Sequence, residues 1–151
     1  VDKTPYIFSQ TYPISIAILT IIVAYLFNLH KRTKLTDNFV FVFSDSIGLS
    51  MFAITGAIVA LQAGFNFGGV VFLSFLTAVG GSIIRDIIMN KVPYVLTNDF
   101  YGTVAFILGT FVWFLSQLDL LNSITTILLL ILGTVLRLLA IKYKWKLPKV
   151  L

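Results

Sequence analysis

The sequence predicts an all-α membrane protein, a bundle of transmembrane helices. Hydrophobic residues make up 58% of the 151-residue chain and charged residues only 11%, whereas soluble domains carry about a quarter charged residues. A soluble domain of this size cannot bury so much apolar surface, because small domains keep much of their surface in contact with water. The apolar residues also form runs of about 20, the length that crosses the hydrocarbon core of a bilayer.

Five segments are long and apolar enough, or nearly so, to be predicted as membrane-spanning helices. They are residues 12–29, 39–62, 67–90, 100–117 and 122–141. Turn-forming residues separate the later ones, with Gly64 after the second, Pro93 after the third, and Asp119 before the last. A water-soluble bundle would need polar faces at helical spacing, and the first, third, fourth and fifth segments have none wide enough.

Basic residues gather just outside the apolar runs. The two clusters are Lys31, Arg32 and Lys34 after the first segment, and Lys142, Lys144 and Lys146 after the last. Such clusters are typical of residues that face anionic lipid. If the helices alternate in direction, both clusters share one side, and the positive-inside rule predicts a multi-pass protein of the cell membrane with a cytoplasmic C-terminus. The net charge of +5 therefore indicates a lipid bilayer as partner, and nucleic acid is not expected, since no RNA- or DNA-binding motif accompanies it.

A short motif occurs twice, as Lys3-Thr4-Pro5-Tyr6 and as Lys91-Val92-Pro93-Tyr94, each just before an apolar segment. We interpret it as an internal repeat; a chance likeness between two membrane helices is the alternative. Three membrane crossings separate the two copies, so the repeats would be inverted in topology, as in many transporters and channels. The expected plan is three helices, three inverted helices and one more, of which five are present here. Two helices, about 50 residues, would be missing from the front.

This plan divides the chain into three parts. Residues 1–38 would hold the last helix of the first repeat and the cytoplasmic basic loop, residues 39–118 the second three-helix repeat, and residues 119–151 the extra C-terminal helix and basic tail. The first apolar run has neither a basic leader before it nor a small-residue cleavage site after it, so it is not expected to be a signal peptide.

Three ionisable residues stand inside apolar segments: Asp45, Arg85 and Asp86. Each costs about 2.5–3.5 kcal/mol at the centre of a membrane helix, so a role in function or in pairing is expected. Asp45 lies about 9 Å into its helix at 1.5 Å per residue, and Arg85 lies at a similar depth, so the two can pair. They are predicted to belong to a charged pathway or gate; the alternative is a structural salt bridge. Arg137, near the end of its helix, is expected to reach out to the headgroups.

Small residues interrupt the third segment at Thr77, Gly80, Gly81 and Ser82. Adjacent glycines permit a kink or a break, and a broken helix at membrane depth is tolerated where it lines a wet cavity. We therefore predict that these residues line a pore; the alternative is close packing of helices. In the second segment, Gly48, Gly56 and Ala57 are expected to serve packing.

No catalytic constellation is present, so no enzyme is predicted. The chain has no cysteine and a single histidine, which leaves no Cys- or His-based metal site. It contains no Ser/His/Asp set and no glycine-rich phosphate loop. No cofactor is expected.

The motifs resemble those of a known family, the prokaryotic trimeric intracellular cation (TRIC) channels, whose domain is also labelled a glycine transporter. The motifs are Asp45-Ser46-Ile47-Gly48-Leu49, Gly80-Gly81-Ser82-Ile83-Ile84-Arg85-Asp86, Lys91-Val92-Pro93 and Arg137-Leu138-Leu139-Ala140 with Trp145-Lys146-Leu147-Pro148. The resemblance implies seven helices in an inverted repeat with one extra. It also implies a homotrimer in which glycine-kinked helices line a potassium-permeable pore within each protomer.

Two departures from the family pattern matter. The family has three consecutive glycines, and here Ser82 takes the third place. The first two helices are also expected to be absent, so the chain as written should form an incomplete pore. A monovalent cation channel is the leading prediction, and a secondary transporter of a small solute such as glycine is the alternative, since inverted repeats serve both.

Overall fold

The computed structural model describes residues 39–88, 90, 92–97, 100–143 and 145, together with Ser15, Ile18, Leu19 and Ile22. The chain divides into two compact units, Val1–Asn38 and Phe39–Leu151. In the first unit the four described residues are helical, and they fall within the helix predicted for residues 12–29. The remainder of that predicted helix lies outside the described residues, as does the first copy of the repeated motif.

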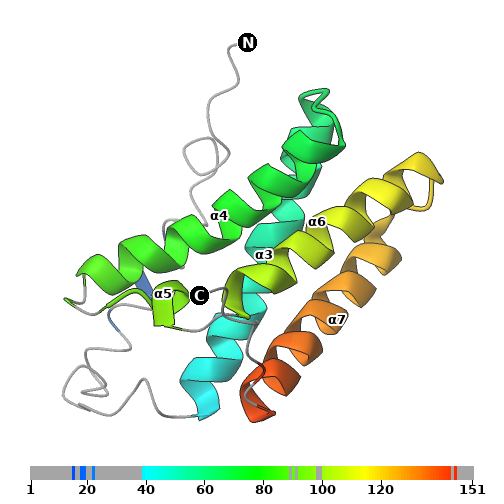
Figure 1. The fold of residues 1–151 in the computed structure, drawn as a ribbon. Helices are drawn as coiled ribbons and strands as arrows, with labels where there is room; N and C mark the ends of the chain where they lie inside the picture. Colours follow the sequence, from blue (N-terminus) through cyan, green and yellow to red (C-terminus); the bar gives the residue numbers. More distant parts are fainter. Residues whose placement is uncertain are drawn as a thin grey trace, which may run out of the picture. The chain divides into compact units, whose positions relative to one another are not determined.

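The second unit consists of helices (Figure 1). They are α3 (Phe39–Gln62), α4 (Phe67–Ile88), α5 (Tyr94–Thr97), α6 (Tyr101–Gln117) and α7 (Ser123–Lys142). The four long helices agree with the predicted segments to within two residues at each end. The described residues thus contain four long helices where five were predicted, and the four-residue α5, which includes the tyrosine of the repeated motif, was not predicted.

Three of these helices are long and apolar enough to cross a membrane: Phe41–Gln62, Phe67–Ile88 and Ser123–Lys142. The fourth apolar helix, Tyr101–Gln117, is shorter. Large apolar side chains such as Phe72, Ile84 and Ile131 are exposed on these helices. Apolar side chains on the outside of a helix bundle are expected where the surroundings are lipid, so these faces agree with the prediction of a membrane protein.

Small side chains bring the helices together. α3 packs against α4, α6 and α7, and α6 packs against α4 and α7. On α3 the contact faces carry Ala53, Ala57 and Ala60, all fully buried, and on α6 they include Ala105 and Gly109. Small residues let helix backbones approach closely, and the resulting van der Waals packing is one of the contributions that associate helices in lipid.

Three glycines are required by these close approaches. A Cβ at Gly56 would lie 2.6 Å from Thr77 Oγ1, one at Gly109 would lie 2.7 Å from Ser74 Cβ, and one at Gly133 would lie 2.6 Å from a methyl carbon of Leu108. All three distances are shorter than real Cβ contacts allow. Gly56 therefore packs α3 against α4, as the sequence predicted.

A buried hydroxyl also joins three helices. Ser74 on α4 is fully buried, and its Oγ lies 2.9 Å from the carbonyl oxygen of Ala53 on α3 and 3.0 Å from that of Ala105 on α6. The single hydroxyl hydrogen donates to one carbonyl at a time or is shared between the two, and a hydrogen bond between membrane helices contributes about 0.6 kcal/mol. The serine hydroxyl thus links α4 to both α3 and α6.

The turns before α4 and α7 are formed by residue types that favour turns and helix caps. Gly64 has a φ of 76°, and the N–H of Phe65 donates to the carbonyl of Ala60 at 3.0 Å, which closes the end of α3. At the start of α7, the Asn122 side chain accepts from the backbone N–H of Ile124 and of Thr125. These turns end one long helix and start the next where the predicted breaks occur.

Candidate functional site

A partly open cavity of about 360 Å³ is lined by residues of α3 and α4 and by one residue of α6. From α3 it is lined by Phe41, Ser44, Asp45, Gly48, Leu49 and Phe52. From α4 it is lined by Ala78, Gly81, Ser82 and Arg85, and Tyr101 begins α6. The spacing of three, four and seven residues puts each set on one face of its helix, so α3 and α4 together provide most of the lining.

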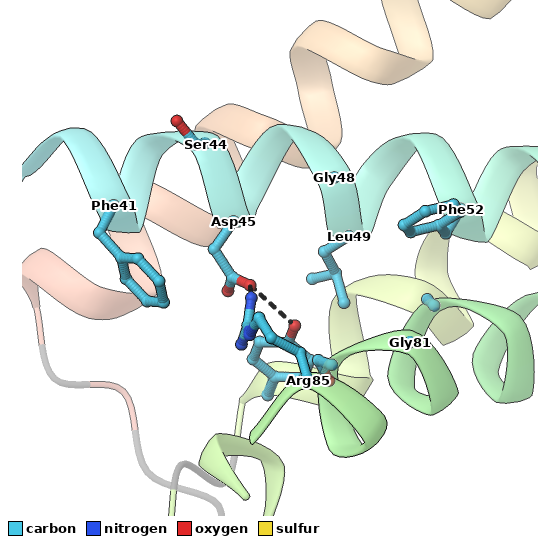
Figure 2. A pocket seen from close by; sticks show the side chains of 11 residues that line it. Phe41, Ser44, Asp45, Gly48, Leu49, Phe52, Gly81 and Arg85 are labelled. Atoms are coloured by element: carbon cyan, nitrogen blue, oxygen red, sulfur yellow. Dashed lines mark hydrogen bonds and ion pairs between the residues drawn. The ribbon is translucent and has the colours of Figure 1, made fainter. Parts of the chain in front are cut away.

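Charged side chains face each other across this cavity. Figure 2 shows Asp45 on α3 and Arg85 on α4 pointing toward one another, with Phe41 and Phe52 on either side along α3. Arg85 Nη1 donates to Asp45 Oδ1 at 2.6 Å. Arg85 Nε and Nη2 each lie 2.9 Å from Oδ1 of Asp86. The pairing of Asp45 with Arg85 that the sequence predicted is confirmed.

The arginine is the more accessible member of this cluster. Its side chain is 32% exposed, against 10% for Asp45 and 8% for Asp86. Its guanidinium carbon also lies 5.2 Å from the centre of the Phe41 ring. Two carboxylates around one guanidinium lower the cost of keeping charge at membrane depth, because each charge has a partner of opposite sign within hydrogen-bond distance.

The predicted pore residues of α4 divide into two groups. Gly81 and Ser82 line the cavity, whereas Gly80 and Thr77 do not. Thr77 instead lies against Gly56, and its hydroxyl donates to the carbonyl of Leu73 at 2.7 Å. α4 is one continuous helix from Phe67 to Ile88, so it is not broken at the two glycines, and a kink there stays a prediction. Within a helix each extra residue turns the side chain by about 100°, which sends Gly80 and Gly81 to different faces.

Gly48 was predicted to serve packing, and the described residues do not bear this out. A Cβ at Gly48 would meet no atom of the described residues within 4 Å, in contrast to Gly56 on the same helix. Gly48 borders the cavity between Asp45 and Phe52. The absence of a side chain there keeps space open beside the charged cluster.

The role of Tyr101 in the site was missed at the sequence level, and Arg137, which lies beside it, was misplaced. Tyr101 lines the cavity, and its hydroxyl lies 3.4 Å from Asp45 Oδ1. Arg137 was expected to reach the headgroups, but it is only 1% exposed. Its guanidinium carbon lies 4.5 Å from the centre of the Tyr101 ring. Two signals pointed to Arg137: its charge within an apolar helix, which indicates function or pairing, and its place in a motif that carries the family resemblance.

The predicted membrane-surface residues are mostly beyond the described part of the chain. Lys31, Arg32, Lys34, Lys144 and Lys146 fall there. Lys142 closes α7 and is exposed, with its ammonium nitrogen 5.8 Å from the ring centre of Tyr143. This position agrees with a cation at the end of a membrane helix.

The chain is similar to bacterial membrane proteins. The UPF0126 membrane protein YvgT of Bacillus subtilis (strain 168) is 36% identical over 135 residues, which cover 88% of this chain and 63% of YvgT. The chain thus spans less than two thirds of the length of this curated relative.

Solved structures of ion channels share its fold. One, described as the structural basis for conductance through TRIC cation channels, has a TM-score of 0.76 and 34% sequence identity, over 95% of this chain and 68% of that one. A second, a prokaryotic TRIC channel crystallised in 0.5 M KCl, has a TM-score of 0.80 and 29% identity, over 95% of this chain and 71% of that one.

A family model matches the part of the chain that builds the cavity. Residues 42–117, about half of the chain, match the family described as glycine transporter. The match contains Asp45, Gly81, Arg85 and Tyr101, and so includes most of the cavity lining. The resemblance seen in the motifs is thereby confirmed. The chain is a membrane protein that belongs to the glycine-transporter family, the family of the TRIC channels.

Proposed function

We propose that this chain is part of a monovalent cation channel in which potassium passes along the cavity between α3 and α4. The observation that carries the proposal is the Asp45 carboxylate at membrane depth, on the wall of a cavity of about 360 Å³. A carboxylate on a pore wall attracts cations by its field. The similarity to solved TRIC cation channels supports the same function.

Arg85 would control access of the cation to Asp45. With Nη1 at 2.6 Å from Asp45 Oδ1, the guanidinium occupies the place that a cation would take. Its second carboxylate, Asp86, is on the same helix at 2.9 Å. Arg85 therefore keeps a counterion when it leaves Asp45, which lowers the cost of admitting a cation. Conduction requires such weak, exchangeable binding.

The rest of the architecture is proposed from the sequence and the relatives. Gly81 and Ser82, with Gly48 opposite, would keep the pathway wide, and a bend of α4 at Gly80 and Gly81 would shape it. The inverted three-plus-three repeat with one extra helix, the homotrimer and the cytoplasmic C-terminus in the cell membrane belong to this proposal. So does the expectation of a non-enzymatic protein that needs no cofactor beyond its permeant ion.

A specific feature favours a second candidate, uptake of glycine. Asp45 and Arg85 present opposite charges to one small cavity. They match the ammonium and carboxylate groups of a zwitterionic amino acid, and the family model carries the description glycine transporter. In this case the substrate would separate the two side chains and pair with both.

A flux assay on the full-length protein in liposomes distinguishes these functions. For a channel we expect potassium flux that follows the potassium gradient, a linear current–voltage relation and no coupling ion. Saturable glycine uptake driven by a gradient, without ionic current, would assign the protein as a transporter instead. Protein-free liposomes provide the baseline, and flux no higher than theirs for both solutes would contradict both proposals.

A further inference from the structure

A buried arginine, Arg137, contacts a residue that lines the cavity. Arg137 on α7 is 1% exposed and is not among the residues that line the cavity. Its guanidinium carbon lies 4.5 Å from the centre of the Tyr101 ring. A cation at this distance over an aromatic face is attracted by the ring's electrons, more strongly where water is excluded. This contact holds the ring of Tyr101 in place.

Tyr101 connects this arginine to the charged cluster. It is the first residue of α6, is itself 1% exposed, and its hydroxyl donates to Asp45 Oδ1 over 3.4 Å. The same oxygen accepts from Arg85 Nη1 at 2.6 Å. Hydrogen bonds between oxygens are usually about 2.7–2.8 Å long. With Arg85 in place, the hydroxyl is therefore the weaker of two donors to one oxygen.

The two donors differ in their freedom to move. Arg85 is 32% exposed, borders the cavity and has Asp86 as a second partner. Tyr101 is fully enclosed, and a guanidinium lies against its ring. If one donor leaves Asp45, it is Arg85. The hydroxyl of Tyr101 then remains beside the carboxylate and can shorten its hydrogen bond.

We propose that Tyr101, held by Arg137, is a positioning residue that keeps the Asp45 carboxylate oriented while Arg85 is displaced by a cation. The inference rests on the proposed channel function and assigns a role to two residues outside the Asp45–Arg85 pair. The positive charge of Arg137 over the ring draws electron density from it and makes the hydroxyl a better donor. Without this second donor, a freed Asp45 would change its rotamer and lose its place on the pathway.

A double-mutant cycle in the full-length protein tests the proposal. Tyr101→Phe removes only the hydroxyl and retains the ring that packs against Arg137. We expect it to lower potassium flux by about twofold alone, and by about fivefold or more in the Arg85→Gln background, since interacting residues act non-additively. Tyr143→Phe is the matched control, because this exposed tyrosine also has a cation near its ring. It should have no effect in either background.

The role of Arg137 is tested through Tyr101. Arg137→Lys keeps the charge but loses the planar guanidinium that lies over the ring. We expect it to lower potassium flux in the Arg85→Gln background and to have no further effect once Tyr101→Phe is also present. An equal loss in both cases would overturn the assignment of Arg137 as the residue that holds Tyr101.

Thermal unfolding separates failure of this inference from failure of the channel proposal. Even if the native protein passes no potassium, the sharing of Asp45 predicts that Tyr101→Phe lowers Tm by less than about 2 °C alone and by about 4 °C or more in the Arg85→Gln background. Equal Tm shifts in the two backgrounds would show that the hydroxyl has only a local structural role. That result, or additive effects on flux, would overturn the proposal.

Discussion

Replacing Asp45 by Asn is expected to lower potassium flux by at least about tenfold. Asparagine has nearly the same shape but no charge, and Arg85 keeps Asp86 as its partner. The cavity then offers a cation no free carboxylate. A unit charge 4 Å away contributes about 4 kcal/mol at an effective dielectric constant of 20. Loss of about a third of this contribution already reduces ion occupancy tenfold.

The opposite substitution provides the control for this prediction. Arg85→Gln removes the competitor of the cation and should raise flux at low potassium concentration, where occupancy limits transport. Asp45→Asn combined with Arg85→Gln should again reduce flux to the level of Asp45→Asn alone. Liposome flux at several potassium concentrations measures all three variants. A fall of the same size for both single variants, with lowered Tm, would mean that the pair serves only to hold α3 against α4.

Replacing Gly81 by Leu is expected to block the pathway, with flux lowered by about tenfold or more through an apolar constriction that excludes water. Gly81 lines the cavity, and a Cβ added there would lie 3.9 Å from a ring carbon of Phe52 on the opposite wall. The remaining carbons of leucine would fill the space between the two helices. Leucine also favours a helix interior over glycine by up to about 1 kcal/mol, so unfolding is not the expected cause of the loss.

The neighbouring glycine is a matched control. Among the residues that the structure describes, a Cβ at Gly80 would meet nothing within 4 Å, and Gly80 lies outside the cavity lining. Gly80→Leu should therefore lower flux much less than Gly81→Leu does, while gaining the same helix propensity. Size-exclusion chromatography and measurement of Tm are the checks that both variants fold. Equal flux in the two variants would contradict the assignment of the cavity as the pathway.

The long helices and the charged pair could be predicted from the sequence because each depends on distance along the chain. Apolar runs of about 20 residues determine where helices cross a bilayer. The rise per residue places Asp45 and Arg85 at the same depth, and antiparallel helices then bring them within 2.6 Å. Neither inference requires knowledge of which helix face meets which neighbour.

The roles of the glycines could not be predicted, because they depend on helix rotation. In water, a polar stripe marks the outer face of a helix. α3 and α4 are apolar nearly all round, so the sequence does not reveal that Gly48 faces a cavity while Gly56 faces Thr77. For the same reason, the sequence does not reveal that Gly81 faces the cavity while Gly80 does not. Spacing from the charged residues could have identified the two cavity glycines. Gly48 lies three residues after Asp45, and Gly81 lies four residues before Arg85, so each shares a helix face with its charged residue.

Arg137 was misinterpreted for a different reason. Its position near the end of a predicted helix allowed a long side chain to reach water. The structure instead places the start of α6 beside it, and the ring of Tyr101 provides a surface for the guanidinium. A contact between α6 and α7 cannot be derived from the spacing of residues within either helix. The short α5 was missed because four residues give no helical periodicity.

The most direct test of the pathway uses a cysteine at Gly48. The chain has no native cysteine, Gly48 lines the cavity, and a side chain there has open space. We predict that a trimethylammonium methanethiosulfonate reagent modifies the Gly48→Cys protein and lowers potassium flux by about tenfold or more, since it places a fixed positive charge on the pathway. Mass spectrometry measures the extent of modification in the same samples. Complete modification with unchanged potassium flux would contradict passage of the ion along this cavity.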